Sequence, residues 1–431
     1  MVIKHRYDYF AVWQTILEGE FVTEEILKKY ADVVIEAGIN LQKDQCLLIT
    51  CGVDNYDFAL VAAQAAYEKG ARYVDISVSG SKLTKIKSRY SNPENLSFVP
   101  NFVTGRTMEM LADDWAHLRL DNTEETDELA DEDISKLESI SRAERNAIKL
   151  FTKQLISFNK KWCIIAVPGR KWADKIFGNH YTEANYEKLS GAISKILRLD
   201  SPDPVQTWKE HAAKLHNRSV KLSQMKLDRV RFWGGGTDLE IGVIPGSKWK
   251  GGYSETFSNS KFIPNLPTEE VFTTPDFTRT KGMAKVTRPV KVLEKTVTGA
   301  WFEFREGKVV NFGADQNKEA LEKFLEVDEG AKYLGEAALV DSSSPIFQSG
   351  IVFNSILYDE NAACHIALGR GFSSVLPESE DGGSESDLKK RKCNVSLVHT
   401  DFMIGHESIN VSGFDCSNKE IEIIKNGKFV I

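Results

Sequence analysis

A histidine and an aspartate near the C-terminus have the types and spacing of metal ligands. His399 and Asp401 lie two residues apart in the largely apolar segment 395–405, whose composition predicts a strand. Residues two apart in a strand face the same way, so the two side chains would project side by side. An ionised aspartate on an apolar strand needs a cation or hydrogen-bond donors, and imidazole with carboxylate suits a divalent ion. A buried His–Asp hydrogen bond that only fixes the strand explains the pair equally well.

A second histidine, His365, lies in the run of small and apolar residues 358–369, which we interpret as a short helix ending at Gly369. A lone histidine in such surroundings is usually a buried core residue. The preceding acids Asp359 and Glu360 favour a ligand role only somewhat. Cys364 has no neighbouring base or dipole that would activate its thiol, so we interpret it as a packing residue.

Two glutamates are weaker candidates when each is taken alone. Glu336 stands at the head of the apolar segment 334–340, which predicts a strand, and Glu270 lies between Pro267 and Pro275. Either one alone fits an edge residue that faces water. The glycine-rich segment 234–237 lacks the lysine and the spacing of a phosphate-binding loop, and it predicts a tight turn between strands.

The elements that would position these residues differ between the two halves of the chain. In the first half, helical spacing over 24–37 and 58–69 alternates with apolar strand segments at 46–52, 73–78 and 162–168. Such βαβ units build parallel, helix-covered sheets. From about Leu227 short β-rich segments dominate. We therefore predict an N-terminal α/β domain with a parallel sheet over 1–222. A β-rich α+β domain that binds metal would follow over 223–431.

Two polar stretches interrupt this pattern. The acidic segment 121–133 is interpreted as a solvated loop and a helix start. The segment 377–391 predicts an exposed loop between the candidate histidines His365 and His399. Two interpretations are open for it, a gating role and a passive insertion, and the passive insertion is favoured.

Bulk composition excludes several classes of partner. A length of 431 residues favours two domains. The net charge of −7 argues against nucleic acid or an anionic membrane as the main partner. No window approaches the roughly 20 apolar residues of a membrane span, and residues 1–8 do not resemble a signal peptide. Six scattered cysteines without CxxC pairs indicate reduced thiols. We expect a cytoplasmic protein.

Four segments in the same order and with similar spacing resemble the M29 aminopeptidases, the aminopeptidase T group. They are residues 267–272, 334–336, 357–365 and 399–405. The resemblance is strong over about 235–413 and fainter in the first half. It implies a homodimer that removes N-terminal residues from peptides with two divalent ions such as zinc, cobalt or manganese. Carried over by motif, the metal ligands would be Glu270, Glu336, His365, His399 and Asp401, with Glu269 the competing choice to Glu270.

The resemblance also suggests roles for two carboxylates. Glu336 would be shared by both ions, and Glu360 would shuttle a proton to the leaving amine or act as an additional ligand. One departure from the family stands out. The family usually has a tyrosine near the metals, seven residues after the histidine at 365, and this chain has Phe372. A phenyl ring can neither ligate a metal nor donate a hydrogen bond.

Three other functions compete with a metal-dependent aminopeptidase. The same cluster could serve a metallohydrolase of a non-peptide amide. The presence of Phe372 suggests a second alternative, a catalytically silent relative that binds metal or peptide. The βαβ pattern of the first half could also belong to a nucleotide-binding domain, but it lacks a phosphate-binding fingerprint.

Overall fold

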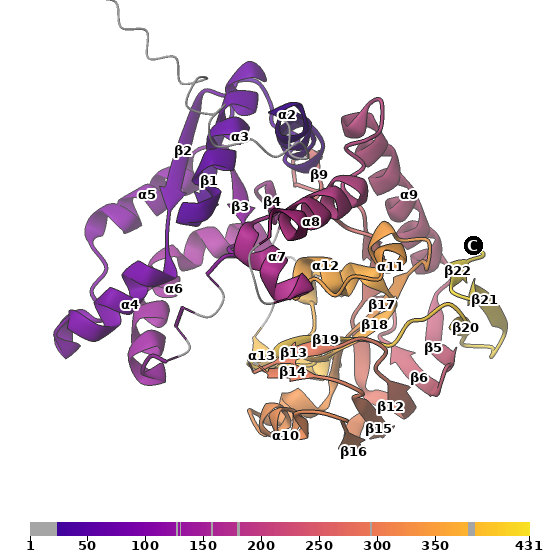
Figure 1. Ribbon diagram of the computed structural model, residues 1–431. Coiled ribbons are helices and arrows are strands. Elements are labelled where there is room, and N and C mark those ends of the chain that lie inside the picture. The colour runs from indigo at the N-terminus through magenta and orange to yellow at the C-terminus, as the bar shows by residue number, and fades with distance from the viewer. Residues whose placement is uncertain are drawn as a thin grey trace, which may run out of the picture.

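The computed structural model describes residues 24–125, 128–129, 131–156, 158–178, 182–293, 295–377 and 384–431. In this part, the chain forms an N-terminal unit of helices around a parallel sheet and a C-terminal unit built mainly of antiparallel strands (Figure 1). The predicted fold class is thereby confirmed. Residues 1–8, on which the expected lack of a signal peptide depends, lie outside the described residues.

The N-terminal sheet consists of parallel strands in the order β10-β4-β3-β1-β2. Their bounds are β1 Cys46–Cys51, β2 Tyr73–Val78, β3 Trp115–Leu120, β4 Trp162–Ile165 and β10 Asn265–Leu266. Leu47 and Ile49 of β1 belong to one hydrophobic core, while Cys46 and Leu48 belong to another on the opposite face. A strand buried on both faces has an uninterrupted apolar sequence, which explains why β1 could be predicted.

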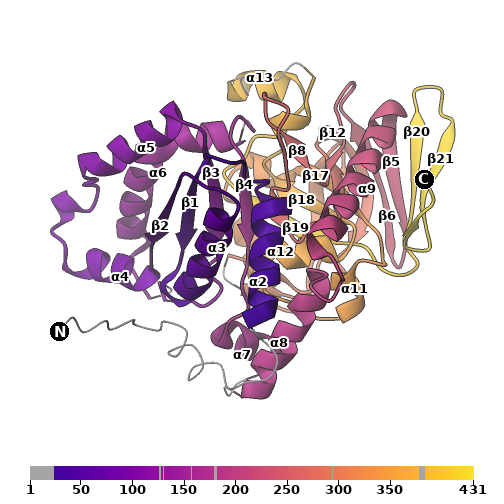
Figure 2. The ribbon, with the colours of Figure 1, turned by 90° about the horizontal axis from the view of Figure 1, so that it is seen from above.

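Helices cover both faces of this sheet (Figure 2). On the Leu47 face lie α2 Glu24–Asp32, the π-helical Val33–Gly38, α3 Tyr56–Glu68, α8 Glu183–Ile196 and α9 Pro204–Gln224. On the other face lie α5 Asn101–Ala112 and α6 Ile134–Ile156. Two more helices, α4 Ser81–Tyr90 and α7 Arg170–Phe177, follow β2 and β4.

The C-terminal unit contains two large antiparallel sheets. The eight-stranded sheet has the order β16 Lys308–Gly313, β15 Trp301–Arg305, β12 Pro275–Lys285, β6 Thr237–Val243, β5 Leu227–Gly234, β20 Asn410–Asp415, β21 Glu420–Lys425 and β22 Lys428–Phe429. The five-stranded sheet has the order β19 His399–Met403, β18 His365–Gly369, β17 Leu334–Val340, β11 Glu270–Thr273 and β7 Lys250–Gly251.

Smaller elements complete this unit. They are the strand pairs β8 Ser254–Glu255 with β9 Lys261–Phe262 and β13 Val290–Val292 with β14 Lys295–Val297, and the helices α10 Lys318–Leu325, α11 Pro345–Ser349, α12 Ile356–Asp359 and α13 Glu385–Lys390.

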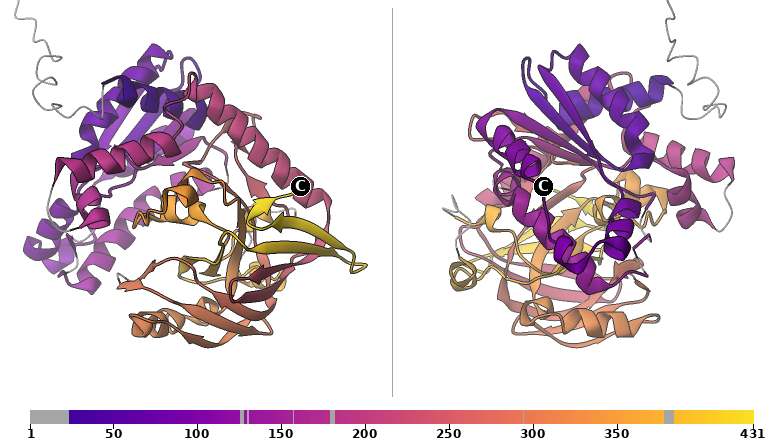
Figure 3. Two further views of the ribbon diagram at one scale, coloured as in Figure 1. Left: turned by 45° about the vertical axis from the view of Figure 1, so that its right-hand side comes forward. Right: turned by 90° about the vertical axis from the view of Figure 1, so that its left-hand side faces the viewer.

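The five-stranded sheet of the C-terminal unit lies between the eight-stranded sheet and the N-terminal unit (Figure 3). Its apolar face packs into the core that it shares with the eight-stranded sheet, through residues such as Leu339, Ile366 and Phe402. Alternation along the strands then turns the side chains of Glu336, His365 and Asp401 to the opposite face. Burial of one face thus fixes which residues face the N-terminal unit.

The two units are joined by more than one stretch of chain. Helix α9 ends at Gln224 and β5 begins at Leu227. At this point the sequence predicts a change from alternating helices and strands to short β-rich segments. However, β10 comes from the second half of the sequence and pairs with β4 in the N-terminal sheet, with Asn265 opposite Ile164. The domain boundary at 222/223 stays a proposal.

The structure corrects the local prediction at His365. Residues 365–369 form β18, a central strand between β17 and β19, and the helical turns end at Ala362. A short run of small apolar residues fits a buried helix and a buried strand equally well, and only pairing with two neighbouring strands decides between them. The predicted turn at 234–237 is confirmed, because Gly234 pairs with Thr237 at the end of the β5–β6 hairpin. A Cβ on Gly235 (φ +58°) would collide with the His406 ring.

None of the described helices is long and apolar enough to cross a bilayer. The six cysteines carry no disulfide, and five of them are buried. Burial raises the pKa of the Cys364 thiol to about 12, so this thiol is uncharged at neutral pH. Its interpretation as a packing residue agrees with its hydrogen bond to the Val340 carbonyl, 3.3 Å away.

Candidate metal centre

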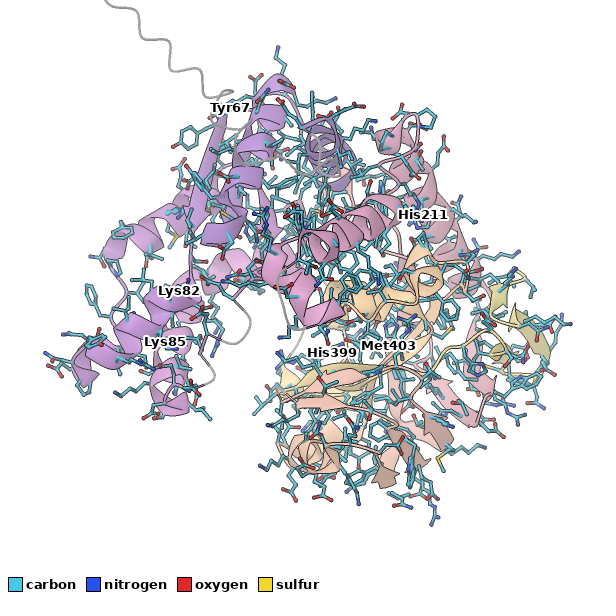
Figure 4. The ribbon with its side chains drawn as sticks, in the orientation of Figure 1. Tyr67, Lys82, Lys85, His211, His399 and Met403 are labelled. Carbon is cyan, nitrogen blue, oxygen red and sulfur yellow. The ribbon has the colours of Figure 1, made fainter. Side chains whose placement is uncertain are left out.

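Four neighbouring strands bring the predicted ligands to one face of the five-stranded sheet. Glu270 begins β11, Glu336 is in β17, His365 begins β18, and His399 and Asp401 are in β19. The strand register places His365 opposite Ala338, Asp401 opposite Ala367 and His399 opposite Gly369. Small residues at these opposed positions leave the space above the sheet to the larger polar side chains. His399 lies where the C-terminal strands approach α7 and α12 (Figure 1 and Figure 4).

These side chains form two overlapping groups. Ligand atoms of Glu270, Glu336 and His365 all lie within 4.8 Å of one another. The same holds for Glu336, His399 and Asp401. Glu336, which is only 4% exposed, is common to both groups.

Each histidine presents Nε2 to the carboxylates. His365 Nε2 is 3.2 Å from Glu270 Oε2, and His399 Nε2 is 3.2 Å from Glu336 Oε2 and 3.4 Å from Asp401 Oδ1. Nδ1 of His365 lies 3.1 Å from the Ala363 carbonyl, and Nδ1 of His399 lies 2.7 Å from the Arg370 carbonyl. A carbonyl can only accept, so both Nδ1 atoms carry the proton. Metal-binding histidines are commonly oriented by such a hydrogen bond, which leaves Nε2 for the ion.

Two carboxylate oxygens of the cluster lack a hydrogen-bond partner among the described residues. Glu270 Oε2 and Asp401 Oδ1 are buried and accept no hydrogen bond of acceptable geometry, although each lies near a histidine Nε2. Buried acceptors are almost always satisfied. Atoms held about 3.4 Å apart at the corners of a tetrahedron would suit an ion with bonds of roughly 2.1 Å. The donor set therefore fits divalent cations.

The electrostatics of the cluster indicate a deficit of positive charge. Burial raises the pKa of Glu336 to about 7, and the charges of Glu270 and Asp401 add to this, against an opposing hydrogen bond from His399. Although burial alone would lower the pKa of His365, its interaction with the neighbouring Glu270 carboxylate raises it to about 10. Without cations, the cluster must hold protons to balance its buried carboxylates.

Glu360 lies at the margin of the cluster and belongs to neither group of potential ligands. Burial raises the pKa of its carboxyl well above the usual value, and the charges of Glu270 and Asp401 act in the same direction. Its Oε1 accepts a hydrogen bond of 3.3 Å from the Asn361 amide. A carboxyl whose pKa is raised in this way can hold a proton near neutral pH, as a proton shuttle requires. Asp359, by contrast, accepts from the Phe353 and Ser355 amides and orders the loop before α12.

The two adjacent glutamates at 269 and 270 have different surroundings. Glu269 Oε1 accepts a hydrogen bond of 2.6 Å from Arg198, and its Oε2 lies 3.2 Å from His211 Nε2. These partners hold its side chain toward α9, where His211 is located, and away from the cluster (Figure 4). Glu270 faces His365 instead. This geometry favours Glu270 as the ligand, in agreement with the motif.

Phe372, which replaces the tyrosine expected from the resemblance, lies directly beside the cluster. Its ring centre is 5.0 Å from that of His399 and 5.4 Å from that of Phe272. Phe372 is 37% exposed and the His399 side chain is 25% exposed. The cluster is therefore open to solvent on this side, with an apolar ring at its margin.

Sequence reasoning missed a residue that positions the cluster, Asn361. Its Oδ1 accepts a hydrogen bond of 2.7 Å from the Glu269 amide. Its amide nitrogen donates to the Leu357 carbonyl and to Glu360. Asn361 thus connects the start of β11 to the segment that carries Glu360. The only signal in the sequence was its location between Glu360 and His365.

The carboxyl edge of the N-terminal sheet does not present free helix N-termini at α4 and α7. Glu125 Oε2 accepts from the Ser81 amide at 2.6 Å, and Glu124 accepts from the Lys171 and Trp172 amides at 3.0 and 2.9 Å. Carboxylates thus occupy the places where a nucleotide phosphate would bind. This arrangement argues against the nucleotide-binding interpretation. It also corrects the view of 121–133 as merely solvated, because Glu125 is buried.

Part of the predicted loop at 377–391 is helical. Residues 385–390 form α13, which begins with a capping box at Ser384 and Asp387. Residues 378–383 lie outside the described residues. The gating role stays a hypothesis.

Comparison with known proteins agrees with the motifs. The sequence profile of the family described as thermophilic metalloprotease (M29) matches residues 23–429. Aminopeptidase 2 of Geobacillus stearothermophilus is 33% identical over 406 residues, which are 94% of this chain and 98% of that protein. Aminopeptidase T of Thermus aquaticus is 32% identical over 410 residues, 94% of this chain and 99% of that protein.

A solved structure shows the same similarity in three dimensions. Wild-type AmpT from Thermus thermophilus superposes with a TM-score of 0.86 at 30% identity. The match covers 95% of this chain and 100% of that one. Both units of the fold are therefore shared, together with their arrangement.

Proposed function

The chain belongs to the M29 family of metallopeptidases, and from this premise we propose that it is a metal-dependent aminopeptidase that removes residues from the N-termini of peptides. The observation that carries the proposal is the shared position of Glu336. This buried carboxylate belongs to two groups of potential ligands, each completed by a histidine Nε2 and a further carboxylate.

We assign five residues to two divalent ions, such as zinc, cobalt or manganese. Glu270 and His365 would hold one ion, His399 and Asp401 the other, and Glu336 would be shared between them. The orphaned oxygens of Glu270 and Asp401 support this assignment. When bound, such ions lower the pKa of a water molecule and polarise the carbonyl of a peptide bond.

The chain itself would supply proton transfer. Glu360 lies beside the cluster, and in its ionised form its carboxylate would accept a proton from the attacking water and pass it to the leaving amine. The hydrogen bond from Asn361 holds its carboxyl in place.

Hydrolysis of leucine-, arginine- and aspartate-based chromogenic amides tests the proposal. The protein would be assayed after metal removal and then with cobalt, zinc or manganese added, beside His399→Ala. We expect activity that returns with metal and is lost in the variant, and a metal content of two ions per chain. Inactivity toward all amides and peptides, in a folded protein that binds two ions, would reject the proposal.

That negative result would favour the second candidate, a catalytically silent relative that binds metal or peptide. Phe372 beside His399 is the observation that favours it. A third candidate, a metallohydrolase of a non-peptide amide, would hydrolyse such amides but not peptides. The homodimer implied by the resemblance is likewise proposed here, and sedimentation would test it. The cytoplasmic location stays a prediction.

A further inference from the structure

A cavity of about 1070 Å³ lies beside the edge strand β7, between α9 and the residues that follow β6. Its wall is mainly apolar and includes Leu222, Val243 and Trp249. Lys250 lines it from β7, beside Phe158 from the N-terminal unit. No step of the proposed hydrolysis uses this cavity.

The charged groups of the cavity are unbalanced. Its acids have partners elsewhere, since Asp228 pairs with Arg279 at 2.8 Å and Glu255 with Lys261 at 3.8 Å. Its three lysines, Lys226, Lys248 and Lys250, form no ion pair with any described residue. Within the described part of the chain, the cavity therefore offers unpaired positive charge.

Lys250 is the most enclosed of these lysines. Its ammonium lies 4.5 Å from the centre of the Phe158 ring. Burial, with a contribution from Lys248, lowers its pKa to about 8. The neighbouring Ser247 hydroxyl also lines the cavity, and it is buried without a hydrogen-bond partner in the described structure. An anion held here would pair with the ammonium and could accept from the hydroxyl.

Lys250 is on the same face of the five-stranded sheet as the metal ligands. It pairs with Phe272 across β7 and β11, and opposed residues of an antiparallel pair face the same side. Phe272 is two residues from Glu270 and therefore shares that face. The Phe272 ring contacts Phe372, which contacts His399. One row of side chains thus leads from the cavity to the cluster.

The separation fits a short peptide. From strand spacings of about 4.8 Å and residue spacings of about 3.4 Å, the Cα atom of Lys250 is roughly 8–12 Å from those of Glu270 and Glu336. An extended peptide advances about 3.3–3.6 Å per residue. A peptide with its first peptide bond at the cluster would therefore bring its end to Lys250 after about three to five residues.

We propose that this cavity receives the C-terminal residue of a short peptide substrate, with Lys250 holding the terminal carboxylate and the apolar wall holding the side chain. The assignment rests on the aminopeptidase function proposed above. Binding of the C-terminal residue in this cavity would make the protein selective for peptides of about three to five residues with a free C-terminus.

Binding tests the assignment without turnover. Acetyl-Gly-Gly-Phe and its C-terminal amide would be titrated calorimetrically into the wild type, Lys250→Gln and Lys250→Arg. The matched control is Lys221→Gln, an exposed lysine of α9 that does not line the cavity. We expect the acid to bind about tenfold more tightly than the amide, as for one charge-assisted hydrogen bond. Lys250→Gln should abolish this difference, whereas Lys250→Arg and the control keep it. Equal binding of acid and amide to the wild type would overturn the proposal.

Kinetics then distinguish whether the cavity binds the C-terminus of a peptide substrate or a separate carboxylate molecule. The substrates would be peptides with an N-terminal leucine, a varied number of glycines and a C-terminal phenylalanine, each as free acid and as C-terminal amide. In the wild type, the kcat/KM of the acid divided by that of the amide should be largest for peptides of three to five residues. In Lys250→Gln this ratio should fall to about one. A ratio independent of length would assign the cavity to free carboxylates and overturn the substrate role. A chromogenic leucine amide is too short to reach Lys250, so its hydrolysis by the wild type tests the metal cluster alone. Failure of the wild type on that amide would reject the proposed function, while the binding result would still decide the cavity.

Discussion

At each of the two cluster histidines, a backbone carbonyl decides which nitrogen faces the carboxylates. The carbonyls of Ala363 and Arg370 engage the Nδ1 atoms of His365 and His399, so the Nε2 atoms point into the cluster. The unsatisfied oxygens of Glu270 and Asp401 lie near these Nε2 atoms. A purely structural His–Asp pair would satisfy these oxygens, and the structure therefore favours the ligand role over that alternative.

The adjacent glutamates 269 and 270 provide a matched pair of variants. We expect Glu270→Ala to lose bound metal with a small change in stability, because it removes a ligand. Glu269→Ala should keep its metal but lose about 3–5 kcal/mol of unfolding free energy, because it leaves Arg198 without its buried carboxylate. Metal content by mass spectrometry and thermal unfolding measure the two effects. Metal loss in Glu269→Ala instead would exchange the two assignments.

Glu360 should affect turnover and spare metal binding. Replacing its carboxyl in Glu360→Gln removes the proton carrier, and kcat should fall about 10²- to 10⁴-fold. The metal content should stay at the wild-type value because Glu360 belongs to neither ligand group. The exposed Glu326→Gln serves as control. A variant that loses metal would identify Glu360 as an additional ligand.

Phe372→Tyr should raise activity. The ring already lies 5.0 Å from His399, so a hydroxyl added there would stand at the exposed margin of the cluster. One hydrogen bond gained in the transition state corresponds to about a tenfold increase in kcat. Steady-state assays on the chromogenic amides measure it. Unchanged or reduced kcat would show that the chain functions without a donor at this position.

At the scale of elements, two kinds of structure hold the site. The strands β11, β17, β18 and β19 fix the ligands rigidly, because their opposite face is packed into a core. Glu360 comes instead from a short helical turn after α12. That turn is held by the hydrogen bonds of Asn361 to the Glu269 amide and the Leu357 carbonyl. A proton carrier on this turn depends on few contacts.

Asn361→Ala should therefore disturb the turn more than the strands. It leaves the buried Glu269 amide unsatisfied, which costs about 1–3 kcal/mol of unfolding free energy. It also releases Glu360, so kcat should fall while the metal content stays at the wild-type value. Thermal unfolding and assays at saturating substrate measure these effects. Normal kcat in a destabilised variant would restrict Asn361 to a structural role.

At the scale of the whole molecule, the N-terminal unit supports the segment that carries Glu360. Trp172 Nε1 donates to the Phe353 carbonyl at 2.6 Å, and the Tyr358 hydroxyl donates to the Ala166 carbonyl at 3.4 Å. Trp172 and Tyr358 also meet edge to face with ring centres 5.5 Å apart. The site thus depends on contacts between the two units, although its ligands come from the C-terminal unit.

The buried cluster should make the metal-free protein sensitive to pH. The pKa of Glu336 is raised from 4.5 to about 7, so the folded state binds more protons than the unfolded state in that window, and stability falls as pH rises through it. The pKa of His365 is raised from 6.5 to about 10, so its contribution is present below pH 6.5 and is lost toward pH 10.

Melting temperatures of metal-free and metal-loaded protein from pH 5 to 10 test this expectation. The metal-free protein should lose on the order of a few kcal/mol over this range. The loaded protein should lack this loss, because bound ions replace the protons of the cluster. Parallel curves for the two forms would contradict the assignment of these residues to metal.

The sequence by itself predicted three strands of the N-terminal sheet, β1, β2 and β4, most plainly β1, because burial on both faces leaves an uninterrupted apolar run. Strands β3 and β10 became evident only in the structure. The types and spacing of His399 and Asp401 were also sufficient to suggest a metal site, and family motifs supplied Glu270 and Glu336. Only the tertiary structure decided that His365 is in a strand, because its short apolar segment acquires a conformation from its neighbours β17 and β19.

The roles of Glu269, Asn361 and Lys250 were also decided only by the tertiary structure. The partners that define these roles, Arg198, the Glu269 amide and Phe158, lie 71, 92 and 92 residues away along the chain. Local sequence patterns report periodicity and composition within one element. They carry no information on which distant element will lie beside it, and it is that proximity which sets burial, charge and hydrogen bonding at this site.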